Sequence, residues 1–135
     1  MEAFTAGSVP LGAAVAGAAR ADVVIEGLEQ AGPSFGGHVF LDNPDATLDT
    51  PRTVEHGYAG SFSVFGQGGG SAGARPADAG GGAVAPITKE VIATGAVRAA
   101  AERGADAVSV TIVPEPRGAA APAPLSPSRI AIVVR

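Results

Sequence analysis

A length of 135 residues and a net charge of −4 already limit what this chain can do. The length suits one domain, and the nine basic residues are scattered, which excludes the basic footprint that non-specific nucleic-acid binding needs. The absence of cysteine excludes disulfides, cysteine zinc sites and thiol catalysis, and no apolar run is long enough to span a bilayer.

The hydrophobic core has to be built from few large side chains. Glycine occurs 20 times and proline 11 times, while aromatic residues make up only 4% of the chain. Val, Ile, Leu and five Phe must therefore supply the core. We expect a domain of marginal stability, or one that gains stability from a partner.

Residues 1–20 are interpreted as a leader or linker, followed by a single domain over residues 21–135. The start, Met1 to Thr5, carries an acid where a secretory signal carries Lys or Arg. The stretch Leu11 to Ala19 is rich in Ala and Gly and only weakly hydrophobic. We therefore expect no signal peptide and a cytoplasmic location.

The first half of the domain is predicted to contain two strands and two loops. Asp22 to Leu28 is predicted as a strand because β-branched residues follow one another there. Gly32 to Gly37 indicates a loop from its Gly and Pro content, and His38 to Asp42 indicates a second strand. That strand ends at the turn signal Asn43-Pro44-Asp45, and the polar segment 45–58 is predicted to be a loop.

A third strand is predicted over Gly60 to Gln67, where apolar and polar side chains alternate. This alternation places Phe62 and Val64 on one face and the neighbouring serines on the other. The segment 68–82 is of low complexity and predicts a loop, and a short strand is expected over residues 83–85.

One helix is expected near the middle of the second half. Thr88 is a suitable N-cap for a helix through about Arg103, and Gly104 is a suitable stop. Gly95 weakens this helix by roughly 1 kcal/mol relative to Ala. A strand followed by a break into a helix is therefore the alternative for this segment.

The last part of the chain predicts two more strands. Residues 107–113 alternate in the manner of a strand, residues 114–127 contain five prolines and indicate a loop, and residues 129–135 predict the last strand. Short strands separated by Gly and Pro, with a single short helix, favour a mostly β fold. We predict an antiparallel β-sandwich.

Residue types that carry chemistry show no catalytic arrangement. His38 and His56 are the only imidazoles, and their spacing does not bring them together, so no metal site is predicted. Four carboxylates lie in the predicted loop region: Asp42, Asp45, Asp49 and Glu55. They are interpreted as solvated turn residues, and Ser61 and Ser63 as the polar face of a strand. No cofactor site is expected, because the Gly runs lack the Lys-Ser/Thr of a phosphate loop.

Seven segments, in this order, resemble the β-sandwich that follows the copper domain in tyrosinases, plant polyphenol oxidases and molluscan haemocyanins. They are Pro10-Leu11-Gly12, Ile25 to Leu28, His38 to Asp42, Ala59-Gly60-Ser61-Phe62, Ile87 to Ile92, Val108 to Pro114 and Ile130 to Val134. The most characteristic of them is Ala59-Gly60-Ser61-Phe62. The resemblance covers residues 9–134.

The resemblance implies a non-catalytic module that covers or stabilises a type-3 copper oxidase partner. In that family each copper takes three His ligands, so copper is implied only for the partner, a tyrosinase-like copper-domain protein. An apolar side chain on a loop of the related sandwiches plugs the copper pocket, and Phe35 and Leu48 are the candidates here. Ordinary core packing is the favoured interpretation of both side chains, because apolar residues are usually buried, and the plug is the alternative. The alternative function is an independent β-sandwich that forms homo-oligomers through its strand edges.

Overall fold

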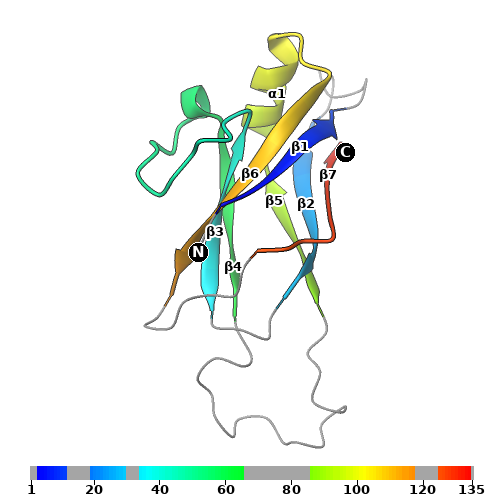
Figure 1. The fold of residues 1–135 in the computed structure, drawn as a ribbon. Helices are drawn as coiled ribbons and strands as arrows, with labels where there is room; N and C mark the ends of the chain where they lie inside the picture. The colour runs from blue at the N-terminus through cyan, green and yellow to red at the C-terminus, as the bar shows by residue number, and fades with distance from the viewer. Residues whose placement is uncertain (1–2, 12–18, 30–33, 66–85, 118–124, 135) are drawn as a thin grey trace, which may run out of the picture.

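The computed structural model describes residues 3–11, 19–29, 34–65, 86–117 and 125–134, and their strands form two antiparallel sheets (Figure 1). The four-stranded sheet has the order β1-β6-β3-β4, with β1 at Phe4–Pro10, β6 at Ala107–Pro116, β3 at Phe35–Leu41 and β4 at Tyr58–Val64. The three-stranded sheet has the order β5-β2-β7, with β5 at Ile87–Ile92, β2 at Ala21–Leu28 and β7 at Arg129–Val134. One helix, α1 (Thr94–Glu102), and a 3₁₀ turn, η2 (Val54–His56), complete the described elements. The predicted mostly β antiparallel sandwich is confirmed.

The core lies between the inner faces of the two sheets. Val23 and Ile25 of β2 and Val39 of β3 are fully buried there, as is Ile112 of β6. The predicted alternation of the third strand is confirmed, because Phe62 is buried while its neighbour Ser61 is exposed. Burying apolar area between sheets is what stabilises this fold.

The second and third strands begin earlier than predicted. Residues 35–37 were predicted to be in a loop, but they open strand β3, because glycine serves close packing here and not a turn. A Cβ atom added to Gly37 would lie 2.3 Å from the ring of Phe62, so only glycine leaves room for that ring. Strand β4 runs over Tyr58–Val64, and Phe65 is 73% exposed beyond its end.

Part of the predicted leader is a strand. β1 pairs antiparallel with β6, and its register shifts between Ala6 and Val9. Val9 and Leu11 are buried in the core. The sequence did not predict this strand, because only small or polar residues lie between Phe4 and Val9 and large apolar side chains therefore do not alternate.

The segment from residue 87 to residue 103 follows the alternative reading, a strand and then a helix. β5 pairs with β2, and α1 begins two residues after β5 ends. α1 buries Ala96, Val97 and Ala100 and ends before Gly104, which has a φ of +84°. With nine residues, α1 is too short to cross a membrane, and the described part of the chain contains no other α-helix.

The remaining predicted strands are confirmed, with shifted ends. β2 begins one residue earlier than predicted, and β6 continues through Pro116. The predicted loop at 68–82, the short strand at 83–85 and residues 118–124 of the proline-rich segment lie outside the described residues.

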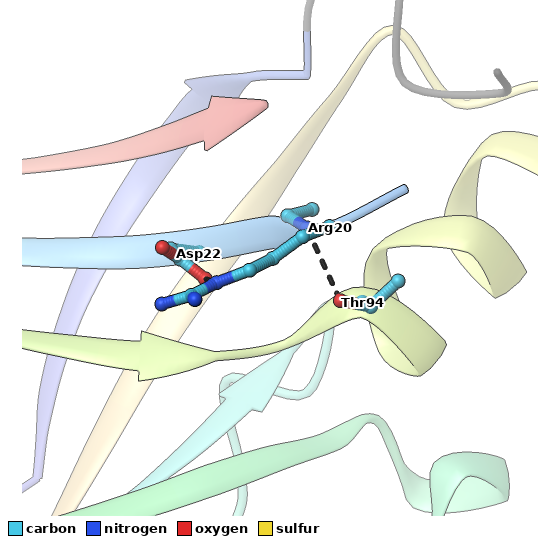
Figure 2. A network of polar contacts seen from close by, with 4 residues as sticks. Arg20, Asp22 and Thr94 are labelled. Carbon is cyan, nitrogen blue, oxygen red and sulfur yellow. Dashed lines mark hydrogen bonds and ion pairs between the residues drawn. The ribbon is translucent and has the colours of Figure 1, made fainter. Parts of the chain in front are cut away.

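Polar contacts tie the start of β2 to the start of α1 (Figure 2). The backbone amide of Ala21 donates to the Thr94 hydroxyl at 3.1 Å, and the Ala93 amide donates to the Ala21 carbonyl at 2.8 Å. Nε of Arg20 donates to the carboxylate of Asp22, whose side chain is fully buried. A buried carboxylate needs such a partner, so this ion pair lets Asp22 remain within the sheet.

Candidate functional site

The segment between β3 and β4, here called the cover loop (residues 42–57), folds back over the outer face of the four-stranded sheet. Figure 1 shows it, in teal, beside the end of that sheet. Ala46 of the loop is buried against Phe40 and Val113, and Tyr58 packs at the edge of the same cluster. The predicted loop is therefore confirmed, but it forms a second small core instead of a free solvated turn.

Hydrogen bonds inside the cover loop fix its shape. The side-chain amide of Asn43 donates to the carbonyl of His56 at 2.9 Å. The backbone amide of Thr47 donates to the Thr50 hydroxyl at 2.9 Å, and the Asp49 amide donates to the Thr47 hydroxyl at 3.2 Å. A loop that makes its own hydrogen bonds presents its side chains with little entropy left to lose on binding.

Both ends of the cover loop have backbone conformations that favour short polar side chains or glycine. Asp42 has a φ of +53°, and its carboxylate accepts the Ser109 backbone amide at 3.0 Å and lies 3.6 Å from the Arg103 guanidinium. Gly57 has a φ of +83°, and a Cβ atom there would lie 2.1 Å from the Leu41 carbonyl oxygen. The amide of Leu41 donates to the carbonyl of Gly57 at 2.8 Å, which closes the base of the loop.

Of the two candidate plug residues, Leu48 alone lies on a loop. Its side chain is 42% exposed on the cover loop. Phe35 lies in strand β3, not in a loop as predicted, and is 5% exposed. Its ring is edge-on to the ring of Phe62, with 6.4 Å between the two ring centroids. Phe35 is therefore a core residue, held there by the aromatic contact and by its place on the inner face.

An open hollow with a volume of about 360 Å³ lies between the cover loop and the end of α1. Val54 contributes an apolar wall, while Leu41 borders the hollow with its side chain buried in the core between the sheets. The polar lining comes from Asp42, Asn43, Glu55, His56 and Arg103. Sequence reasoning singled out neither Val54 nor Arg103, because they lie 49 positions apart and only the fold brings them to one place.

The two histidines lie in different elements, and each has its own hydrogen-bond partner. His38 of β3 is buried, and its Nε2 donates to the Glu115 carboxylate at 3.1 Å. This hydrogen bond is the main cause of the lowered pKa of Glu115. His56 is exposed in η2, with Nδ1 3.0 Å from the Thr53 hydroxyl oxygen. Within the described ranges, no three His, Asp or Glu side chains come together in a way that could hold a metal ion.

The four loop carboxylates lie at the surface, and the two serines lie on the outer side of a strand. Asp42, Asp45, Asp49 and Glu55 are all exposed. Ser61 is exposed and Ser63 is half-buried on the outer face of β4, where neither shows a hydrogen bond to His38 or His56 among the described contacts.

The segment Ala59-Gly60-Ser61-Phe62 brings the two sheets together. Ala59 packs against the core and Phe62 enters it. Gly60 has a φ of +147°, and a Cβ atom there would lie 2.6 Å from a methyl group of Val91 in β5. Glycine therefore permits β4 and β5 to approach closely at this edge of the sandwich.

The chain is similar in structure to polyphenol oxidases. The structure aligns with latent aurone synthase (polyphenol oxidase) from natural source with a TM-score of 0.61 and 18% identity, and with the recombinantly expressed enzyme with the same values. The alignments cover 98% of this chain but only 24% of those chains, so it spans about a quarter of their length. No family model and no curated protein matches the sequence. The likeness confirms, at the level of fold, the resemblance found in the sequence.

Proposed function

We propose that this chain is a non-catalytic module that covers or stabilises a copper oxidase partner of the polyphenol oxidase type. The observation that carries the proposal is Leu48, an apolar side chain 42% exposed on a loop that is fixed by its own hydrogen bonds. The fold supports it, because it matches about a quarter of an enzyme described as latent. A β-sandwich that matches about a quarter of the oxidase chain is more consistent with an accessory module than with the whole oxidase.

The residues of this chain do not fit a type-3 copper pair. Such a pair takes three His ligands per copper in the resembled family, whereas this chain has His38 and His56, which are engaged by different partners. The oxidation of a phenol would therefore take place on the partner. This chain would act on the partner by excluding water and bulky phenols from the copper pocket.

Leu48 has the physical properties of such a plug. Fully burying a Leu side chain contributes about 1.5–3 kcal/mol, so Leu48, which is 42% exposed, would contribute roughly 1 kcal/mol on docking. The loop would lose little conformational entropy on docking, since Ala46 already anchors it to Phe40 and Val113. An apolar contact with a binding energy of this size would occupy a pocket and could still be displaced.

The test is co-purification of the full chain from its host, followed by metal analysis and an assay of catechol oxidation. We expect a copper-containing protein that oxidises catechol slowly in the complex and faster when the chain carries Leu48→Ala. Ile92→Ala is the matched control, because Ile92 is an apolar side chain that is 60% exposed on β5 and is not part of the cover loop. The proposal fails when no copper protein accompanies the chain, or when Leu48→Ala leaves the rate unchanged.

The second candidate is an independent module that associates with itself. Strand edges offer little for this, because β4 lies beside β5 and β1 lies beside β7. The outer face of the three-stranded sheet favours it more, since Ile92 is exposed there and Val24, Ala131 and Val133 are half-buried. Analytical ultracentrifugation at rising protein concentration tests this self-association. A monomer at every concentration would exclude it.

A further inference from the structure

We propose that the hollow beside the cover loop receives a basic side chain, Lys or Arg, of the copper oxidase partner. The inference rests on the proposed function and adds a second, chemically different contact to the apolar one at Leu48. It follows from the acceptors that the hollow displays, from its charge, from its apolar wall and from its place on the loop.

The hollow is rich in hydrogen-bond acceptors. The amide nitrogen of Asn43 is already used in the bond to the His56 carbonyl, which leaves the Asn43 side-chain oxygen as an acceptor. The carboxylates of Asp42 and Glu55 add further acceptor oxygens to the lining. Nδ1 of His56 lies 3.0 Å from the Thr53 hydroxyl oxygen, a contact that positions the ring beside them.

The charge of the lining favours a cation. Asp42 and Glu55 bring two carboxylates, and Arg103 brings one guanidinium, which lies 3.6 Å from Asp42. Glu55 is held ionised, because hydrogen bonds from its own backbone and from Thr53 lower the pKa of its carboxyl. The hollow therefore carries one carboxylate more than it carries guanidinium groups.

One apolar wall suits the stem of a long basic side chain. Val54, which is 47% exposed, supplies this wall, because the Leu41 side chain is buried in the core between the sheets. Lys and Arg lay their methylene stems along apolar surface while the charged head reaches polar groups. A hollow with an apolar wall and acceptors at its rim matches that shape, whereas an acidic side chain would meet Glu55 with like charge.

The hollow and the exposed leucine share one loop. Val54 and Leu48 are both on the cover loop, and the bond between Asn43 and His56 crosses that loop. A protein that received Leu48 would therefore contact the loop that also borders the hollow. The lining is already formed before docking, which lowers the entropy cost of filling it.

The test measures the affinity of the full chain for the copper protein that co-purifies with it, over a range of salt concentrations. We expect Glu55→Gln to weaken binding by roughly 2- to 5-fold at low salt and to reduce the salt dependence of the affinity, because it removes one attractive charge and keeps the shape. Glu55→Lys should weaken binding further. The matched control is Glu29→Gln, an exposed carboxylate that follows β2 outside the hollow.

The outcomes separate this inference from the proposed function. The inference is overturned when Leu48→Ala relieves inhibition while Glu55→Gln and Glu55→Lys bind as the parent does. It is also overturned when Glu29→Gln changes the salt dependence of the affinity as much as Glu55→Gln does. Such a result would mean that any surface carboxylate contributes to binding, whether or not it lines the hollow. When no copper protein binds the chain at all, both proposals fall. Equal thermal midpoints of all variants show that the changes concern docking alone.

Discussion

The two sheets have similar inner faces but different outer faces. On the four-stranded sheet, Phe40 and Thr111 are almost fully buried on the outer side, because the cover loop and cross-strand partners enclose them. On the three-stranded sheet, Ile92 is 60% exposed on the outer side. The difference shows that the chain uses its own loop to close one face, and that closing the face also fixes the loop that displays Leu48.

The largest effect is expected where the cover loop meets the four-stranded sheet. Phe40→Ala should cost about 3–5 kcal/mol of unfolding free energy, because it empties a cluster in which Phe40 is 1% exposed. Ile92→Ala on the other sheet should change the stability by no more than about 0.5 kcal/mol. Urea unfolding of both variants measures this, and equal losses would mean that the two outer faces are equivalent.

A smaller effect is expected at the base of the cover loop. Gly57→Ala should cost about 1–3 kcal/mol, because the new Cβ would meet the Leu41 carbonyl at a positive φ. Gly95→Ala is the control, since this glycine lies in α1 with open space around it. It should stabilise the protein by roughly 0.5–1 kcal/mol. Thermal unfolding should show a lower stability for Gly57→Ala and a higher stability for Gly95→Ala. A loss of stability in both variants would contradict the assigned backbone geometry.

The smallest effect concerns Glu115, whose pKa is lowered from 4.5 chiefly by the hydrogen bond from His38. A carboxylate with a lowered folded-state pKa stabilises the fold above its unfolded pKa, and this contribution is lost as the pH falls through the folded-state pKa. Glu115→Gln should therefore be slightly less stable than the parent at neutral pH. The difference should shrink below about pH 4.5. A stability difference that stays constant from pH 7 to about pH 3 would exclude this role.

Strands with large alternating side chains could be predicted from the sequence. The alternation around Phe62 and from Val108 to Ile112 placed β4 and β6, and the β-branched run placed β2. Strand β1 and the start of β3 were not predicted, because Gly7, Gly36 and Gly37 have no side chain that could take part in an alternating pattern. Gly36 and Gly37 are explained by neighbours far along the chain, the Arg117 side chain and the Phe62 ring, which a local pattern cannot show, whereas Gly7 has open space around it.

The candidate site could be predicted only in part. Leu48 was singled out as an apolar residue on a loop, and that placement is confirmed. The hollow was not predicted, because it needs Val54 and Arg103 from separate elements. The same limit applied to Ala46, whose partner Val113 lies 67 residues away in the sequence.

The strand order has a kinetic consequence. Among the described strands, only β3 and β4 are both paired and consecutive in the chain. β1 must find β6, and β2 must find β7, so most pairings close long loops before any contact compensates for the lost entropy. We expect folding in milliseconds to seconds, with the β3–β4 hairpin and its cover loop as the first structure to form. During synthesis on a ribosome, the three-stranded sheet would stay open until Arg129–Val134 has emerged.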